Sequence, residues 1–195
     1  MRNTKSDIDR RRRRRRRRTQ VVIIYTAIAV GLAWFFESQA TTTIIFVRHA
    51  EKATIPADNP GLNEAGKQRA AELARQLVDA DVIAGIDAVY STSYRRTEET
   101  VQPVATALNL PITPYDASNT ETIMDEIIRE HKGRIVLVVG HSNTVPALIG
   151  NMGASKNVPE ISENEYDNIY IVSVPWFGKT KTIRLRYGAP YVPAQ

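Results

Sequence analysis

The sequence predicts a three-layer α/β fold with a mostly parallel central sheet, preceded by a basic and apolar leader. Apolar, β-branched runs at residues 44–47 and 135–139 have the composition of strands that are buried on both faces. Such strands alternate with segments in which apolar residues recur at helical spacing, which is typical of this fold class. We expect a leader at residues 1–40 and one domain at residues 41–195.

The leader begins with a basic region and continues with an apolar one. Arg10 to Arg18 form an unbroken run of arginines, and the segment 21–36 contains no charge. This order is typical of a secretory signal or a signal anchor, with the arginines on the cytoplasmic side. The apolar segment is short for a bilayer-spanning helix of about 20 residues, and Ser38-Gln39-Ala40 supplies small residues at the spacing of a signal-peptidase site. Cleavage after Ala40 and a retained anchor both stay open, and both predict a domain exported to the cell envelope, periplasmic or otherwise extracytoplasmic.

The basic character of the chain belongs to the leader. The formal net charge is +5, but residues 1–40 alone carry +8, which leaves 15 basic and 18 acidic groups on residues 41–195. We therefore do not expect the folded domain to bind nucleic acid. The chain has no cysteine, which excludes thiol catalysis, disulfides and cysteine-ligated metals.

Turn residues and hydrophobic periodicity place the other elements. Asn63 is expected to cap a helix that runs to about Asp79. Two prolines in the extended segment 110–115 favour an edge strand. Either Asn143 or Thr144 is expected to cap a short helix with a proline in its first turn. The remaining expected elements are a strand at 86–90, a turn at 91–97 leading into a helix to about 109, a helix at 120–131, and a C-terminal hairpin with strands at 169–174 and 180–187.

Arginines and histidines follow the ends of the predicted strands. Arg48 and His49 come directly after the first apolar strand, and His141 follows the second. Arg96 stands at the start of a helix after a third strand. Because carboxyl ends of neighbouring parallel strands meet at one crevice, we expect these side chains to converge. Guanidinium groups beside a helix N-terminus are typical of a phosphate site. The alternative is that both histidines are structural, which is the role we expect for His131 at a helix end.

These residues carry a resemblance to a known family. The segments Arg48-His49-Ala50-Glu51, Ser91…Arg96-Thr97…Thr100 and Gly140-His141-Ser142 resemble the histidine phosphatase superfamily, which has the phosphoglycerate mutase-like fold. Leu62-Asn63-Glu64-Ala65-Gly66 is similar to a further element of that family. The resemblance covers residues 42–187, with the motifs in the family's order and spacing.

The resemblance implies a role for each matching residue. His49 would be the nucleophile that attacks phosphorus and forms a phosphohistidine, which water then hydrolyses. Arg48, Arg96 and His141 would hold the three equatorial oxygens of the phosphoryl group. No metal or other cofactor is expected, because side chains supply the positive charge.

Other site candidates rest on weaker patterns. Asn143 is a further possible donor to the phosphate. Asp116 is the candidate general acid for the leaving group, with a solvated turn residue as the alternative. Glu51 is a second carboxylate beside the nucleophile, which either takes part in the chemistry or orients the loop. By spacing, Arg95 is expected to be a solvated surface residue.

The predicted function is that of an exported phosphomonoesterase of the metal-independent histidine acid type. Its substrate would be a phosphorylated small molecule or a phosphorylated component of the envelope, and loops at 53–61 and 150–166 would line the entrance. One alternative is a phosphoglycerate-mutase-like phosphotransferase. Another is a non-catalytic envelope module that binds a phosphorylated ligand. If the leader is retained, residues 21–36 would contact the membrane.

Overall fold

The computed structural model describes residues 4–38, 41–78, 85–155 and 157–193. The chain divides into two compact units, Met1–Gln39 and Ala40–Gln195, and each is described by itself. The elements of the second unit are β1 (Thr41–Arg48), α2 (Glu64–Val78), β2 (Ala88–Thr92), α3 (Arg95–Leu108), β3 (Ile112–Tyr115), α4 (Thr120–Glu130), β4 (Ile135–Gly140), α5 (Thr144–Asn151), β5 (Asn168–Pro175) and β6 (Lys181–Arg186).

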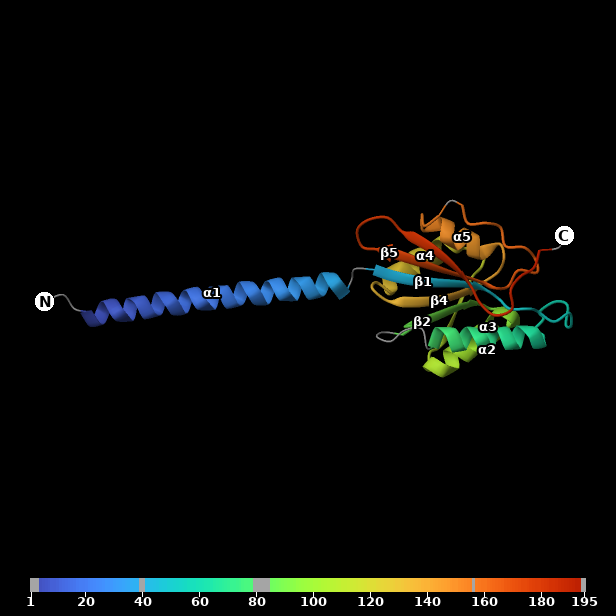
Figure 1. Ribbon diagram of the computed structural model, residues 1–195, viewed down its shortest axis with the longest axis horizontal. Helices are drawn as coiled ribbons and strands as arrows, with labels where there is room; N and C mark the ends of the chain where they lie inside the picture. The colour runs from blue at the N-terminus through green and yellow to red at the C-terminus, as the bar shows by residue number, and fades with distance from the viewer. Residues whose placement is uncertain (1–3, 39–40, 79–84, 156, 194–195) are drawn as a thin grey trace. The chain divides into compact units, whose positions relative to one another are not determined.

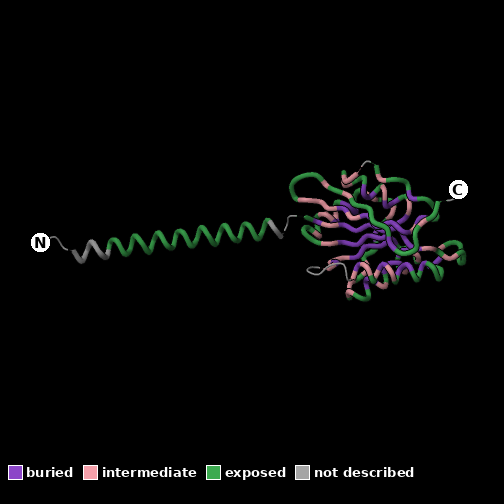
Figure 2. Tube along the Cα trace, in the orientation of Figure 1, coloured by how far each residue is buried: buried purple, intermediate pink, exposed green. Residues whose placement is uncertain are grey.

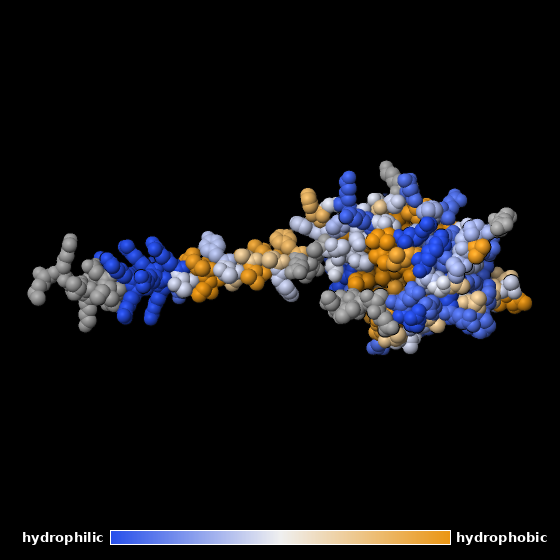
Figure 3. Space-filling model, viewed as in Figure 1, coloured by the Kyte–Doolittle hydropathy of each residue, from blue (hydrophilic) through white to orange (hydrophobic). Residues whose placement is uncertain are grey.

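The first unit is a single helix, α1, at Thr4–Ser38. Its segment Arg10–Phe36 is long and apolar enough to cross a membrane, and no part of it is buried in protein. A signal sequence near the N-terminus meets the same criterion. Figure 3 shows the arginines as a blue block followed by a mostly orange stretch. The cleavage site expected after Ala40 lies outside the described residues.

Six strands form one sheet in the order β3-β2-β4-β1-β5-β6. The strands β3, β2, β4 and β1 are parallel. The strands β5 and β6 are an antiparallel hairpin that pairs with β1. The predicted mostly parallel sheet with a C-terminal hairpin is therefore confirmed, and β3 lies at an edge as expected (Figure 1).

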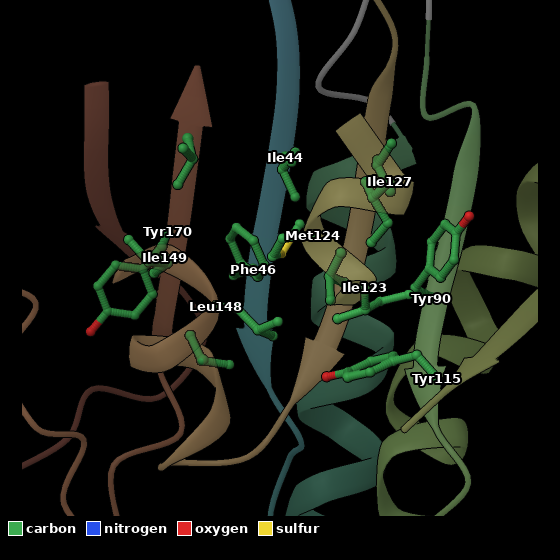
Figure 4. Close-up of a cluster of buried hydrophobic side chains, with 14 of the residues drawn as sticks. Ile44, Phe46, Tyr90, Tyr115, Ile123, Met124, Ile127, Leu148, Ile149 and Tyr170 are labelled. Carbon is green, nitrogen blue, oxygen red and sulfur yellow. The ribbon is translucent and has the colours of Figure 1, made fainter. Parts of the chain in front are cut away.

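Successive residues of β1 point into two separate cores. Ile44 and Phe46 are fully buried in a cluster with side chains of α4 and α5, such as Met124 (Figure 4). Ile45 and Val47 are buried in a second cluster with side chains of α2 and α3. A continuous apolar run is required because side chains alternate between two faces that are both covered. Figure 2 shows these strands as the buried centre of the domain.

The strand β2 lies two residues further along the chain than predicted. It begins at Ala88, because the carboxylate of Asp87 accepts the backbone N–H of Ile135 at 2.9 Å and so closes the entry to the strand. It continues to Thr92, which pairs with Tyr115 of β3. Residues 91 and 92, which were expected to belong to a turn, are therefore part of the strand, because β3 supplies their pairing partners.

The helix α2 begins as the sequence predicted. The side-chain oxygen of Asn63 accepts the backbone N–H of Gly66 at 2.9 Å, which caps the first turn. Gly66 lies against the backbone carbonyl of Glu51, where a Cβ atom would collide. The absence of a side chain at this position therefore lets the start of α2 pack closely on the loop that follows β1.

Candidate active site

The carboxyl ends of β1 and β4 lie next to each other. Arg48 is the register partner of Gly140, and the backbone N–H of His49 donates to the Gly140 carbonyl at 2.9 Å. This pairing brings the rings of His49 and His141 together, with centroids 5.4 Å apart. The convergence expected from the two apolar strands is thus what the parallel pairing produces.

An open cavity of about 1140 Å³ lies at this edge of the sheet. The predicted phosphate-site residues Arg48, His49, Arg96 and His141 all line it. Other residues that line it include Lys52, Thr92, Tyr94, Asp116, Asn143 and Glu163. Glu51 is not one of the lining residues that the structure describes.

The ring of His49 is held in one orientation by its own loop. Its Nδ1 lies 2.7 Å from the backbone carbonyl oxygen of Ala50. A carbonyl oxygen can only accept, so Nδ1 carries the proton and donates it. In the neutral ring, Nε2 then has the free lone pair. This is the nitrogen that can act as a nucleophile in the cavity.

The surroundings of His49 keep it neutral. Burial lowers its pKa to about 3, and the positive charges of Arg48 and Arg96 act in the same direction. The side chain is 4% exposed. An unprotonated imidazole at neutral pH is the form that a nucleophile requires.

His141 is oriented by a chain of hydroxyl groups. Its Nε2 lies 3.0 Å from Thr92 Oγ1, which lies 2.8 Å from Thr97 Oγ1. Thr97 Oγ1 donates to the carbonyl oxygen of Tyr94 at 2.7 Å. Since the Thr97 proton goes to a carbonyl, Thr97 accepts from Thr92, and Thr92 accepts from His141 Nε2–H. The other nitrogen of His141, Nδ1, lies 3.5 Å from Arg96 Nη2.

The pKa of His141 is also lowered, to about 4, by burial first and then by the charges of Arg96 and Arg48. Without an anion in the cavity the ring is therefore neutral at pH 7. A phosphate dianion would oppose the effect of the two arginines and favour the protonated ring. Protonated at Nδ1, His141 would donate a hydrogen bond toward the cavity.

Arg48 is almost fully buried, at 5% exposed. Its Nη1 donates to the backbone carbonyls of Ser162 at 2.7 Å and Glu165 at 3.1 Å, and its Cζ lies 4.3 Å from the ring centre of Tyr166. Burial is the main cause that lowers its pKa. Its Nε has no hydrogen-bond partner among the described residues. A buried, unpaired cationic donor at the cavity wall is suited to an anionic ligand.

Arg96 and Arg95 lie in different environments although they are neighbours in the first turn of α3. Arg96 lines the cavity, with its Cζ 4.4 Å from the ring centre of Tyr94. The Arg95 side chain is 54% exposed and pairs with Glu99 at 3.1 Å. This placement agrees with the expectation that Arg96 belongs to the site and Arg95 to the surface.

The loop that carries His49 is fixed from two sides. The backbone N–H of Ala50 donates to Thr100 Oγ1 of α3 at 2.9 Å. The carboxylate of Glu51 accepts from Arg69 of α2 at 2.8 Å, and Arg69 also donates to the Tyr187 carbonyl at 3.0 Å. The Glu51 carboxylate is thus bound to α2, an arrangement that is consistent with the second of the two roles considered for it.

Two carboxylates lie at the rim of the cavity, those of Asp116 and Glu163. Asp116 is exposed, and its Oδ1 accepts the backbone N–H of Ser118 at 2.9 Å and the Ser118 hydroxyl at 2.7 Å. These bonds lower the pKa of Asp116. A carboxyl with a lowered pKa is ionised at neutral pH and is a poor proton donor there.

The turn after β4 corrects one detail of the sequence analysis. Asn143 lines the cavity but makes no side-chain cap to α5. Thr144 Oγ1 instead accepts the backbone N–H of His141 at 2.8 Å. A Cβ on Gly140 would approach Thr144 Oγ1 to 2.7 Å and the Tyr115 hydroxyl to 2.8 Å. The glycine before His141 is thus required for this tight packing.

Sequence reasoning missed the contributions of Thr92 and Tyr166. Thr92 lies inside a motif segment that was recognised, but its hydroxyl was not assigned to His141. Tyr166 belongs to a polar excursion in which no periodic pattern points to any position. His131, expected to be structural, lies 2.9 Å through Nε2 from the Tyr90 hydroxyl, and the described cavity lining does not include it.

Among the residues that the structure describes, no three His, Asp or Glu side chains form a group that could hold a metal ion. The positive charge at the cavity comes from Arg48, Lys52 and Arg96 and, when it is protonated, from His141. These are the groups that bear on an anionic ligand in this site.

Comparisons with known proteins agree with this geometry. The family model of the histidine phosphatase superfamily, branch 1, matches residues 44–119. Among curated proteins, none matches the chain by sequence.

Solved structures match by fold. One is the protein histidine phosphatase SixA complexed with tungstate, at 20% identity and a TM-score of 0.60, covering 74% of this chain and 96% of that one. Another is a SixA described as a putative phosphohistidine phosphatase from Agrobacterium tumefaciens, at 23% identity and 0.53, covering 76% and 98%. A third is phosphoglycerate mutase from Bacillus anthracis, at 16% and 0.56, covering 71% and 90%.

The matched segment contains Arg48, His49 and Arg96, and the sheet beyond it supplies His141 to the same cavity. The structural matches share the arrangement of strands and helices over nearly their whole length. Residues 44–119 therefore resemble the histidine phosphatase superfamily, and the domain has the phosphoglycerate mutase-like fold.

Proposed function

We propose that this protein is a phosphomonoesterase that forms a phosphohistidine on His49. The observation that carries the proposal is the state of that imidazole. Its Nδ1 is occupied by the Ala50 carbonyl, its pKa is lowered to about 3, and it lines a cavity beside two arginines. A neutral, oriented nucleophile next to buried cations fits attack on a phosphate monoester.

In the first step, the lone pair of His49 Nε2 attacks phosphorus in line with the leaving oxygen. A P–N bond forms, the P–O bond breaks, and the electron pair leaves with the alcohol oxygen, which takes up a proton. Arg48, Arg96 and protonated His141 would stabilise the charge on the three equatorial oxygens. In the second step, water attacks phosphorus and gives a proton to the group that protonated the alcohol, the P–N bond breaks, and neutral His49 is restored as inorganic phosphate leaves.

The proton for the leaving group has three candidate sources at the cavity. Asp116 lines the cavity, and hydrogen bonds from Ser118 lower the pKa of its carboxyl. His141 gains a proton when a dianion enters, and its Nδ1 is next to Arg96. Glu163 lies at the rim and is the other described carboxylate that lines the cavity. Asp116 stays the candidate general acid from the sequence, and His141 and Glu163 are the other two groups at the cavity that could take this role.

The size of the cavity bears on the size of the substrate. The cavity is open and has a volume of about 1140 Å³, so it can admit a substrate with a leaving group larger than a small alcohol. The similarity to SixA structures supports adding a phosphohistidine peptide to a panel of aryl and sugar phosphates. Two alternatives from the sequence remain. An isomerisation assay would detect a mutase, and a phosphate-release assay would separate a phosphatase from a module that only binds a phosphorylated ligand.

The apolar segment of α1 supports export of the domain, either by a cleaved signal or by a retained anchor. Under both readings the domain works on the extracytoplasmic side of the membrane. Protease added to spheroplasts, in which the cytoplasmic membrane is intact, should digest an exported domain, and this experiment tests the topology. Digestion of a domain that is accessible only after cell lysis would contradict export.

The decisive test of the chemistry compares His49→Ala with His131→Asn in the full chain, purified in detergent. With an aryl phosphate and EDTA present, we expect the wild type and His131→Asn to release phosphate. His49→Ala should be reduced by at least about 10³-fold, because it removes the nucleophile. Turnover that His49→Ala leaves unchanged would overturn the proposal, and loss of wild-type activity in EDTA would overturn metal independence.

Direct trapping makes the test independent of rate. With a ³²P-labelled substrate and an alkaline quench, which preserves P–N bonds, label should be found on the wild type and be absent from His49→Ala. Phosphate release that proceeds without label on the peptide containing His49 would exclude this intermediate.

A further inference from the structure

The end of the sheet opposite the catalytic edge has an exposed aromatic and basic tip. The connection between β5 and β6 contains Trp176, at 67% exposed, and Phe177, at 90% exposed. Lys179 follows them and Lys181 begins β6, and both are exposed. Aromatic side chains next to lysines are typical of segments that lie at a membrane–water interface.

The pairing of β1 places this tip at the start of the domain. Thr41, the first residue of β1, is the register partner of Pro175 at the end of β5, and Figure 1 shows the β5–β6 connection at the end where β1 begins. In the sequence, Thr41 comes three residues after Ser38, where α1 ends. Three residues of chain span at most about 10 Å. The tip therefore belongs to the end of the domain to which the apolar segment is joined.

The charge of this end is positive. The loop between α4 and β4 adds Lys132, which is exposed, and its neighbour Gly133 donates through its N–H to Thr42 Oγ1 of β1 at 3.1 Å. Lys132, Lys179 and Lys181 form no ion pair with another residue that the structure describes.

Two of the acidic groups near this end are paired. Asp87 lies 2.8 Å from Arg134, and Glu130 lies 3.6 Å from Arg129. The three lysines are thus uncompensated within the described part of the domain. Such charges attract anionic lipid headgroups.

We propose that the β5–β6 tip, residues 176–181, is a membrane-docking surface that inserts its two aromatic side chains at the interface of an anionic bilayer. The lysines of the tip and Lys132 contact the headgroups. The surface is separate from the catalytic cavity, and the proposal does not depend on the phosphatase chemistry.

The proposal also constrains the substrate. From Thr41 to Arg48 the strand β1 advances seven residues, which is about 23 Å at the rise of a β-strand. If β1 stands along the bilayer normal, docking by the tip would hold the cavity at about that distance from the headgroups, in water. The substrate would then be a water-soluble phosphate ester and not a phosphate on a membrane lipid.

The test uses the full chain with Trp34→Phe, which leaves Trp176 as its one tryptophan because the sequence has two. The protein is reconstituted into vesicles of phosphatidylcholine with brominated acyl chains, with or without phosphatidylglycerol. We expect bromine to quench Trp176 in the vesicles that contain phosphatidylglycerol and to quench it less in phosphatidylcholine alone. Lys179→Glu with Lys181→Glu should remove the quenching, and Lys67→Glu on α2 should retain it as the matched charge reversal.

Each outcome decides the question. Trp176 that bromine does not quench and iodide does would overturn docking. Trp176 that neither reagent quenches would also overturn it and would indicate that this side chain is buried in protein. Quenching that survives the double charge reversal would overturn the role of the lysines. Hydrolysis of a soluble aryl phosphate should be unchanged in the tip variants, which confirms that they are folded.

Discussion

The two ends of the central sheet both carry positive charge, but the cation at one end is buried and the cations at the other end are exposed. At the catalytic edge Arg48 is 5% exposed and its charge is balanced mainly by backbone carbonyls and an aromatic ring. At the other end Lys179 and Lys181 are exposed and unpaired within the described residues. Burying a cation costs free energy of solvation, and an anionic ligand that binds beside Arg48 would offset this cost. An exposed cation costs little, and its effect is a weaker attraction that salt screens.

The same contrast exists between neighbouring residues, and it gives the largest expected effect. Arg96→Ala removes a cation that lines the cavity, and we expect kcat/KM for an aryl phosphate to fall by about 10²–10³-fold. Arg95→Ala removes an exposed residue whose ion pair with Glu99 is worth little, so the change should be about twofold or less. Steady-state kinetics of the two variants checks this. Equal losses in both would contradict the assignment of Arg96 to the phosphate site.

Burial of His49 and His141 predicts that the domain loses stability in mild acid. The pKa values of His49 and His141 are lowered to about 3 and about 4, whereas an unfolded histidine titrates near 6.5. Below that value the unfolded chain binds more protons, so stability is complete above about pH 6.5 and falls as the pH drops toward 4. Between pH 7.5 and pH 5 each histidine should lower the free energy of unfolding by about 2 kcal/mol.

Denaturant titrations at the two pH values measure this loss. His49→Asn should lose less stability than the wild type over the same interval, because one of the two titrating groups is gone. His131→Asn is the control, since His131 lies outside the cavity lining that the structure describes. A wild-type loss equal to that of His49→Asn would show that His49 is not held neutral by its surroundings.

The ends of the sheet also differ in how far the sequence predicts them. His49 and His141 were placed correctly because each directly follows an apolar strand, and parallel neighbours end at one edge. The carbonyls of Ser162 and Glu165 that hold Arg48 were not predictable, because they lie more than 100 residues away in a segment without periodicity. Long-range contacts of backbone atoms leave no pattern in residue types.

Local polar chemistry gave mixed results for a related reason. Asn63 was predicted as a cap because its hydrogen bond is made within its own turn. The sequence did not distinguish Asn143 from Thr144, since both residue types can cap a helix. In the structure the Thr144 hydroxyl bonds to the backbone of His141, in close packing at Gly140. The Asp116 assignment stays a prediction, and Ser118, two residues away, lowers the pKa of its carboxyl. A residue type alone does not fix a protonation state.

The smallest effect we predict concerns a hydroxyl that touches no substrate. Thr92 accepts from His141 Nε2, so Thr92→Val keeps the shape of the side chain and leaves a buried N–H without an acceptor. Loss of that partner lets the ring turn away from Arg96, and we expect kcat/KM to fall by about tenfold, which corresponds to the cost of an unpaired buried donor. Thr92→Ser restores the hydroxyl and should recover most of the activity, which separates this positioning role from a change in packing. Wild-type activity in Thr92→Val would show that the hydroxyl groups of Thr92 and Thr97 have no part in orienting His141.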